Sequence, residues 1–284
     1  MPATEETYTN REQREYWTRQ GEKWARDPDR LERMDGGFGT VMLDAAKLRP
    51  GERVLDVGCG DGATTFAAAA RVAQRGAAVG VDFSRPLLDV ARRQLDHIGK
   101  DNIDFIEADA QVYPFEEEAF DAIVSLFGTM FFEDPEAAFA NLARAVRPGG
   151  RMAVVCWQDV LLSEWTAVIG GTAAAHLGFP DFGPPGAPGP YAFADSDRLK
   201  RIVEAGGFHD VTLEAVTRPM LMGRDVDDVV DYFTSLELVV EWFASHPKDK
   251  VETAVAAVRE ALAPYSKPEG VVMSGSVWLL SANR

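Results

Sequence analysis

The sequence "VLDVGCGDGATT", residues 54–65, joins an apolar run to a stretch of small residues through a glycine-rich loop. Gly58, Gly60 and Gly62 stand at alternate positions, where glycine permits positive φ angles and the close approach of other atoms to the backbone. A turn of this kind between a strand and a helix directs backbone N–H groups and the positive end of the helix dipole at a phosphate or a carboxylate. The loop therefore predicts a ligand site at the end of the strand.

Short apolar segments alternate with helical patterns through residue 157. Such segments, bounded by glycine or acidic residues, are typical of strands covered on both faces of a parallel sheet. Ser84 with Pro86 predicts one helix start, and Asp134 with Pro135 predicts another. The alternation predicts an α/β fold with a doubly wound parallel sheet and right-handed crossovers. The five strand segments are "RVLDVG", "AAVGVDF", "IDFIEAD", "DAIVSLF" and "RMAVVCW".

The composition is ordinary for a globular enzyme, with 46% apolar and 26% charged residues in a chain of 284. The formal net charge of −16 opposes binding to phosphate backbones and anionic lipids, so we expect neither nucleic acid nor a membrane as a partner. Cys59 and Cys156 make no disulfide framework, and neither a signal-peptide core nor a membrane-length apolar run occurs, which predicts a cytoplasmic protein. The histidines and cysteines show no metal-ligand spacing, so we expect no metal.

Two cofactors compete for the glycine-rich loop. "GCGDGA", residues 58–63, satisfies the dinucleotide pattern G-x-G-x-x-G/A, and Asp82 follows at the distance of a ribose-binding acid. This pattern by itself indicates an NAD-dependent oxidoreductase. The acidic Asp56 before the glycines and the later segment "EADA" argue against NAD.

The motifs around the loop resemble those of class I S-adenosylmethionine-dependent methyltransferases, and in particular the bacterial small-molecule group with quinone and natural-product methyltransferases. They occur in that family's order over residues 40–157, and the last pair of strands resembles the antiparallel ending of its sheet. The resemblance implies a seven-stranded, mostly parallel, Rossmann-like fold with S-adenosylmethionine as cofactor. The five motifs are "VLDVGCGDG", "VGVDFS", "IEADAQ", "FDAIVSLFGTMFF" and "AVRPGGRMAVVCW".

The segments outside these motifs predict helical additions to the fold. We expect residues 1–36 to form an N-terminal helical lid, in which Thr9 caps the first helix, and residues 37–284 to form the methyltransferase domain. Insertions at 158–194 and 225–264 are expected to cap the substrate side of the site. The sequence is also compatible with a homodimer.

The resemblance assigns roles to residues at the carboxyl ends of the strands. Asp82 would bind both ribose hydroxyls, since a carboxylate has two acceptor oxygens, and Asp109 would accept from the adenine amino group. Asp56 would orient the loop or accept from the ammonium of the methionine part. Tyr16 and Trp24 of the N-terminal helix are packing anchors or lid contacts. The expected cofactor residues are Tyr16, Trp24, Asp56, Gly58, Cys59, Gly60, Gly62, Asp82, Phe83, Ser84, Asp109, Ala110, Gln111, Ser125, Leu126 and Phe127.

The expected methyl acceptor is a small molecule, partly aromatic or apolar. An asparagine-proline-proline-aromatic motif, associated with methylation of nucleic-acid bases and glutamine amides, is absent from the sequence. His176, in the insertion after the fifth strand, is the candidate general base. The expected acceptor-site residues are Met130, Phe131, Trp157, Trp165 and Tyr191. Three alternatives stay open: an NAD-dependent oxidoreductase, a non-catalytic protein that binds S-adenosylmethionine, and a cofactor-dependent enzyme with a different chemistry.

Overall fold

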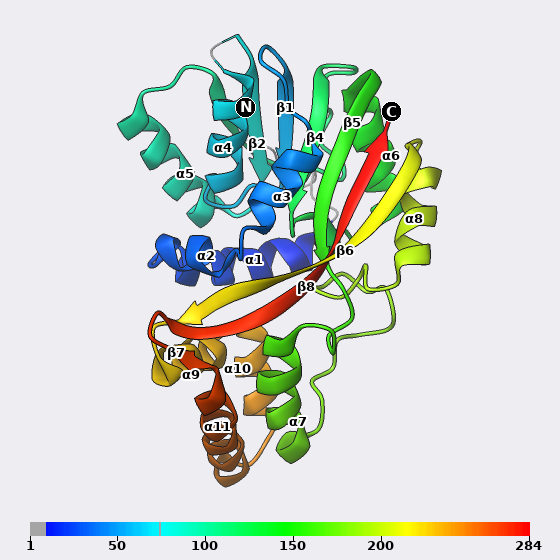
Figure 1. Ribbon diagram of the computed structural model, residues 1–284. Coiled ribbons are helices and arrows are strands. Elements are labelled where there is room, and N and C mark those ends of the chain that lie inside the picture. The colour runs from blue at the N-terminus through cyan, green and yellow to red at the C-terminus, as the bar shows by residue number, and fades with distance from the viewer. Residues whose placement is uncertain (1–9, 74) are drawn as a thin grey trace.

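The computed structural model describes residues 10–73 and 75–284, so the predicted cap residue Thr9 lies outside the described residues. The core of the molecule is a mixed sheet in the order β3-β2-β1-β4-β5-β8-β6, with the short β7 paired to β8 (Figure 1). Strands β1 to β5 run parallel, and β8 is antiparallel to both β5 and β6. The predicted doubly wound topology with an antiparallel last long strand is confirmed, and the two-residue β7 adds an eighth strand to the seven expected. The strands are β1 (Arg53–Val57), β2 (Ala77–Asp82), β3 (Ile103–Glu107), β4 (Phe120–Leu126), β5 (Val146–Trp157), β6 (His209–Gly223), β7 (Ser266–Lys267) and β8 (Gly270–Asn283).

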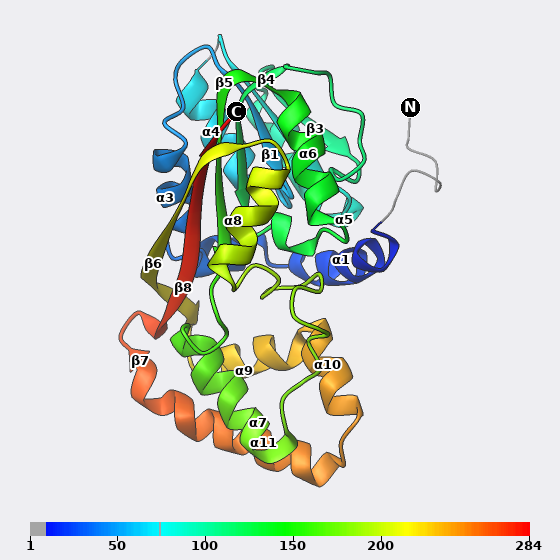
Figure 2. The ribbon, with the colours of Figure 1, turned by 90° about the vertical axis from the view of Figure 1, so that its right-hand side faces the viewer.

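Each face of the sheet has its own hydrophobic core. On one face, Phe38 and Leu88 are fully buried in a cluster that includes residues of α3, α4 and α5. On the other face, Phe139 and Leu199 are fully buried among residues of α6 and α8. Figure 2 shows α3 and α4 on one side of the strands and α6 and α8 on the other. This two-sided cover explains why β1, β4 and the second half of β5 are mostly apolar. The helices are α3 (Phe38–Ala45), α4 (Ala63–Val72), α5 (Arg85–Ile98), α6 (Pro135–Ala145) and α8 (Ser196–Ala205).

Aspartate side chains begin three of the helices. Asp134, Asp195 and Asp225 precede α6, α8 and α9, and each accepts a bond from the backbone N–H three residues later. Such a bond satisfies an N–H group that has no partner within the helix. Ser84, before α5, makes no side-chain cap bond, and its hydroxyl donates to the carbonyl of Trp17 in α1 at 2.9 Å. The start of α5 is therefore tied to the N-terminal helix.

A further layer of helices lies beyond the carboxyl ends of the parallel strands. Figure 1 shows α1 and α2 next to these ends and α7, α9, α10 and α11 farther away, beside the far part of the β6–β8 ribbon. The ribbon reaches them because β6 and β8 have 15 and 14 residues. In the described part of the chain, no helix is long and apolar enough to cross a membrane. These elements are α1 (Arg11–Trp24), α2 (Pro28–Met34), η2 (Thr129–Phe131), η3 (Thr166–Gly170), α7 (Gly171–Leu177), α9 (Val226–Ser235), α10 (Glu237–Ala244), α11 (Lys248–Leu262) and η4 (Ala263–Tyr265).

The buried ring of Phe139 offers a test of the second core. Phe139→Ala leaves a cavity between the sheet, α6 and α8, so we expect the free energy of unfolding to fall by about 3–5 kcal/mol. Urea denaturation measures this loss. Glu136→Gln, on the exposed side of the same helix, is the control and should change stability by less than about 0.5 kcal/mol. Equal losses in both variants would contradict the assignment of this core.

Candidate active site

The glycine-rich loop is held between the ends of β2 and β4. The N–H groups of Gly58 and Cys59 donate to the carbonyl of Val81 at 2.8 and 3.1 Å. Gly58 has φ +69°, and a Cβ atom on it would lie 2.6 Å from the Cα atom of Gly128, just after β4. Any larger residue at position 58 would therefore push the loop away from β4 as well as strain the backbone.

Asp82, the last residue of β2, lies at the centre of the candidate site. Its two carboxylate oxygens accept from the N–H groups of Gly60 and Ser84 at 2.9 and 2.7 Å. Burial raises the pKa of Asp82, and these backbone bonds oppose that rise. The side chain lines the cavity described below, and its two oxygens together retain acceptor capacity for a ligand. Two adjacent acceptors facing a cavity suit a vicinal diol such as ribose.

Asp56 has a different position from Asp82. It is 1% exposed, and its Oδ2 atom accepts from the hydroxyl of Thr65 on α4 at 2.6 Å. It is not among the residues that line the cavity. Burial raises the pKa of Asp56 from 3.8 to about 7. Of the two roles expected for Asp56, this geometry supports bracing of the loop through α4.

A cavity of about 610 Å³ opens in front of the loop and Asp82. It extends from the carboxyl ends of β1, β2, β4 and β5 to α1, α2, α9 and α10, so it joins elements that are far apart in the sequence. Nine of the expected cofactor residues line it: Tyr16, Trp24, Gly58, Cys59, Gly60, Asp82, Phe83, Leu126 and Phe127. The others that we expected, besides Asp56, lie behind this surface: Gly62, Ser84, Asp109, Ala110, Gln111 and Ser125.

Asp109 binds the start of the N-terminal helix in this structure. It is 3% exposed, and both of its oxygens accept from Nδ2 of Asn10 at 2.8 Å. Oε1 of Gln111 accepts from the N–H of Asp134 at 3.0 Å, and the carbonyl of Ala110 accepts from the side chain of Asn141. The expected adenine contacts thus serve as links between chain segments here. The sequence offered no sign of the Asn10 contact, because 99 residues separate the two partners.

Mostly aromatic side chains form a second wall of the cavity beside the loop, the aromatic wall, and all five expected acceptor residues belong to it. The ring of Phe127 stacks on that of Trp157 with centroids 4.4 Å apart and an angle of 16° between the planes, and Trp165 meets Trp157 edge-on. Phe127 has φ +63°, an unusual backbone conformation for a bulky residue, and such residues concentrate at functional sites. The ends of β4 and β5 therefore present one continuous aromatic surface to the cavity.

The structure does not bring His176 to this site. His176 is exposed on α7 and is not among the lining residues, so the expectation that it is the general base is not supported. The sequence suggested His176 only because it lies in an insertion.

Titratable residues that line the cavity and that sequence reasoning missed are Asp35, Asp61 and Tyr232. Burial raises the pKa of Tyr16 and of Tyr232 to about 12, so both phenols are protonated at neutral pH. Among the described residues, no group of three or more His, Cys, Asp or Glu could hold a metal ion.

Comparisons with known proteins agree with this geometry. Residues 54–150 match the model of a family described as a methyltransferase domain. The chain is a class I S-adenosylmethionine-dependent methyltransferase. The methyltransferase is similar to nocamycin O-methyltransferase of Saccharothrix syringae, with 29% identity over 242 residues that cover 78% of this chain and 82% of that protein. It is also similar to demethylmenaquinone methyltransferase of Clavibacter sepedonicus, with 40% identity over 106 residues, 37% of this chain and 41% of that protein.

Solved structures agree on the fold of this methyltransferase. The YcgJ protein of Bacillus subtilis superposes with a TM-score of 0.56 at 17% identity, covering 87% of this chain and 97% of the other. The cofactor of the family fits the residues present. Gly58 and Gly128 leave no room for a side chain where the loop meets β4, and Asp82 directs spare acceptor sites into the cavity. The methyltransferase therefore has S-adenosylmethionine as its cofactor.

The raised pKa of Asp56 predicts a pH dependence of stability. Between pH 3.8 and about 7 the folded chain holds a proton on Asp56 that the unfolded chain has lost, so stability falls as the pH rises through this range. Asp56→Asn removes this titration and keeps an acceptor for Thr65. Without ligand, we expect the variant to exceed the wild type in free energy of unfolding by about 1–3 kcal/mol at pH 8, and by much less at pH 4. Urea denaturation at both pH values measures this difference in free energy of unfolding. The same difference at pH 4 and at pH 8 would contradict the prediction.

Proposed function

We propose that this methyltransferase acts on a small, largely apolar acceptor that contains an aromatic ring. The observation that carries the proposal is that the glycine-rich loop, Asp82 and the aromatic wall all line the same cavity. Such a cavity can hold a cofactor and an acceptor in contact, away from water. Binding the two reactants in line accelerates transfer because it replaces a bimolecular encounter by a fixed geometry.

The residues lining the acceptor side support an uncharged, apolar acceptor. No lysine, arginine or histidine occurs among the described residues that line the cavity, so a phosphate or carboxylate on the acceptor would have no cationic partner there. Leu161 and Phe179 line the cavity and are nevertheless 63% and 66% exposed, which places them at its opening. An apolar molecule would thus meet apolar side chains from the opening inward. The aromatic and methionine residues on this side are Trp24, Met34, Met130, Phe131, Trp157, Trp165, Phe179, Phe182, Tyr191, Met220, Tyr232, Phe233 and Trp242.

The names of the two relatives are consistent with such an acceptor. One is named for nocamycin and one for demethylmenaquinone, and each name includes methyl transfer. The alignment with the first relative spans most of both chains, whereas the alignment with the second spans less than half of either. We therefore extend to this protein the class of acceptor, a natural product or a quinone, and not a particular molecule.

The chain's own residues account for binding and proton transfer. The cofactor, when bound, supplies a methyl group already activated on a sulfonium. We assign to Asp82 the ribose hydroxyls, and to the loop residues Gly58 to Gly60 the methionine part. The protonated phenols of Tyr16 and Tyr232 can donate hydrogen bonds to the acceptor but cannot take its proton at neutral pH.

We propose Asp35 in place of His176 as the group that takes a proton from a hydroxyl acceptor. Asp35 lines the cavity and accepts from the N–H of Gly39. Its Oδ2 atom and the Cδ2 atom of Leu126 both lie 3.5 Å from the point where a Cβ of Gly39 would be. The carboxylate is therefore close to the end of β4, where the expected cofactor residues Leu126 and Phe127 line the cavity.

We also propose that the outer helices enclose the bound molecules. The lid expected for residues 1–36, of which 10–36 are described, contributes Tyr16, Trp17 and Gln20 to the cavity. The insertions at 158–194 and 225–264 contribute most of the aromatic residues of the acceptor side. Opening of these segments would then control access to the cavity.

Calorimetric titration tests the cofactor part of this proposal. We expect S-adenosylmethionine and S-adenosylhomocysteine to bind the wild type and NAD not to bind. Asp82→Ala should weaken the binding of both adenosyl ligands by at least about 100-fold, because the change removes charge-assisted hydrogen bonds to the ribose. Asp104→Ala, an exposed carboxylate on the neighbouring strand β3, is the control and should bind normally. Binding of NAD, or equal binding by the Asp82 variant, would overturn the assignment.

The role of Asp35 is tested by kinetics with phenolic and hydroquinone acceptors. Asp35→Asn keeps an acceptor for the N–H of Gly39 and removes the base, so we expect kcat to fall by about 10²–10⁴ with little change in the affinity for S-adenosylhomocysteine. His176→Ala should leave kcat unchanged. No loss in the Asp35 variant would contradict the role of Asp35, and a large loss in the His176 variant would restore His176 as the candidate base.

A further inference from the structure

One side of the N-terminal helix α1 packs on the cofactor side of the sheet domain. Tyr16, Trp17 and Gln20 of α1 line the cavity. A Cβ atom on Gly21 would lie 2.3 Å from the hydroxyl oxygen of Ser84, so only glycine allows the helix to come this close to α5. The bond from Ser84 to the carbonyl of Trp17 forms at the same contact. The position of α1 therefore shapes the pocket next to Asp82.

The other side of α1 binds the cap mainly through Glu237, the first residue of α10, and Nζ of Lys23 also donates to the carbonyl of Ser235 at the end of α9 at 2.9 Å. The carboxylate of Glu237 accepts from Nζ of Lys23 at 2.6 Å and from Nε of Arg19 at 3.0 Å. Its backbone N–H donates to Oε1 of Gln20 at 3.2 Å. The hydrogen bond from Lys23, followed by the contribution from Arg19, holds the pKa of Glu237 below its usual value. Glu237 thus contacts three residues of α1, of which Arg19 and Lys23 are partly exposed and Gln20 is buried.

Glu237 lies within the segment that forms the acceptor wall. Its neighbours Leu236, Leu238 and Val239, and Trp242 one turn later, all line the cavity. The same residue therefore connects the cap over the acceptor to the helix beside the cofactor. The side chain of Gln20, which is 2% exposed and lines the cavity, makes this connection inside the protein.

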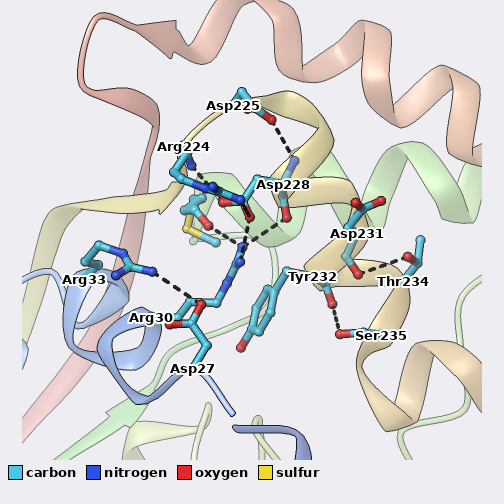
Figure 3. A network of polar contacts seen from close by, with 11 residues as sticks. Asp27, Arg30, Arg33, Arg224, Asp225, Asp228, Asp231, Tyr232, Thr234 and Ser235 are labelled. Atoms are coloured by element: carbon cyan, nitrogen blue, oxygen red, sulfur yellow. Dashed lines mark hydrogen bonds and ion pairs between the residues drawn. The ribbon is translucent and has the colours of Figure 1, made fainter.

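A separate set of contacts fixes α2 to α9. Figure 3 shows the guanidinium of Arg30 directed at Asp228, with an Nη1 to Oδ1 distance of 3.1 Å, and above the ring of Tyr232 at 4.1 Å from its centroid. Arg224 binds the same carboxylate. These side chains of Arg30 and Asp228 are only 12% and 14% exposed. These contacts hold α2 and α9 together independently of Glu237. A change at Glu237 can therefore free α1 without releasing the whole cap.

We propose that Glu237 is a positioning residue for the cofactor. Through Lys23, Arg19 and Gln20 it holds α1 over the bound cofactor. The product of the cofactor, S-adenosylhomocysteine, then leaves only when this contact opens. The inference rests on the proposed function in taking this cavity as the cofactor site. Each exposed ion pair contributes little by itself, but the three contacts converge on one residue and one of them is inside the protein. The expected consequence is slower release of S-adenosylhomocysteine when the contact is intact.

Stopped-flow displacement of S-adenosylhomocysteine from the full chain, followed by intrinsic tryptophan fluorescence, measures this release. We expect Glu237→Gln to raise the dissociation rate about tenfold, a change equivalent to about 1.4 kcal/mol. Lys23→Met should raise the dissociation rate by a smaller factor. In the double variant the dissociation rate should rise by less than the product of the two single-variant factors, because both changes break the same contact. Raising the salt concentration should speed release from the wild type more than from Glu237→Gln.

Glu241→Gln is the matched control, because it makes the same change of charge one turn later on the exposed side of α10. Its dissociation rate should stay within twofold of the wild type. A dissociation rate for Glu237→Gln that also stays within twofold would overturn the inference, and so would additive effects of the two single variants. If Glu237→Gln does not fold, the dissociation rate of Lys23→Met is compared with that of Glu241→Gln, and no difference between them would overturn the inference. Failure of the wild type to bind S-adenosylhomocysteine would instead contradict the cofactor site.

Discussion

The close contact between Gly58 and Gly128 is the constraint on which the site depends. Backbone meets backbone there, with no room for a Cβ atom on Gly58, and the N–H groups of Gly58 and Cys59 bind the end of β2 at the same place. The loop is thereby fixed relative to three neighbouring strands. Its position determines where the N–H of Gly60 meets Asp82, and hence where the carboxylate presents its free lone pairs to the cavity.

The aromatic wall of the cavity is held in place by side-chain packing. Phe127 accepts a left-handed backbone conformation, which costs of the order of 1–3 kcal/mol, and its ring stacks on Trp157. Stacking and burial of these rings offset that cost. The result is a rigid apolar surface beside a polar backbone loop. A charged cofactor and an apolar acceptor can thus share one cavity, because the polar partners are supplied by the main chain and Asp82 and not by the acceptor wall.

The predicted fold could be obtained from local patterns. The five apolar segments became β1 to β5 because their apolar residues pack into the two cores, and Asp134 caps its helix as its position before Pro135 predicts. The five expected acceptor residues line the cavity, since they follow strand ends or lie in the insertions. The surroundings of His176, Asp109 and Ser84 could not be predicted from the sequence. Their surroundings depend on α1 and α7, whose docking leaves no local pattern in the sequence.

The sequence by itself determined the sheet, the glycine-rich loop and the carboxylate after β2, because these depend on hydrophobic alternation, backbone freedom and a fixed spacing along the chain. Only the tertiary structure decided that Asp56 braces a helix, that Asp35 reaches the cavity, and that Glu237 binds α1 across 214 positions from Lys23. Contacts over such separations form only after the elements have packed, and they depend on which side chains the packing brings together. Local sequence patterns therefore do not reveal these contacts, because packing alone brings the partners within hydrogen-bonding distance.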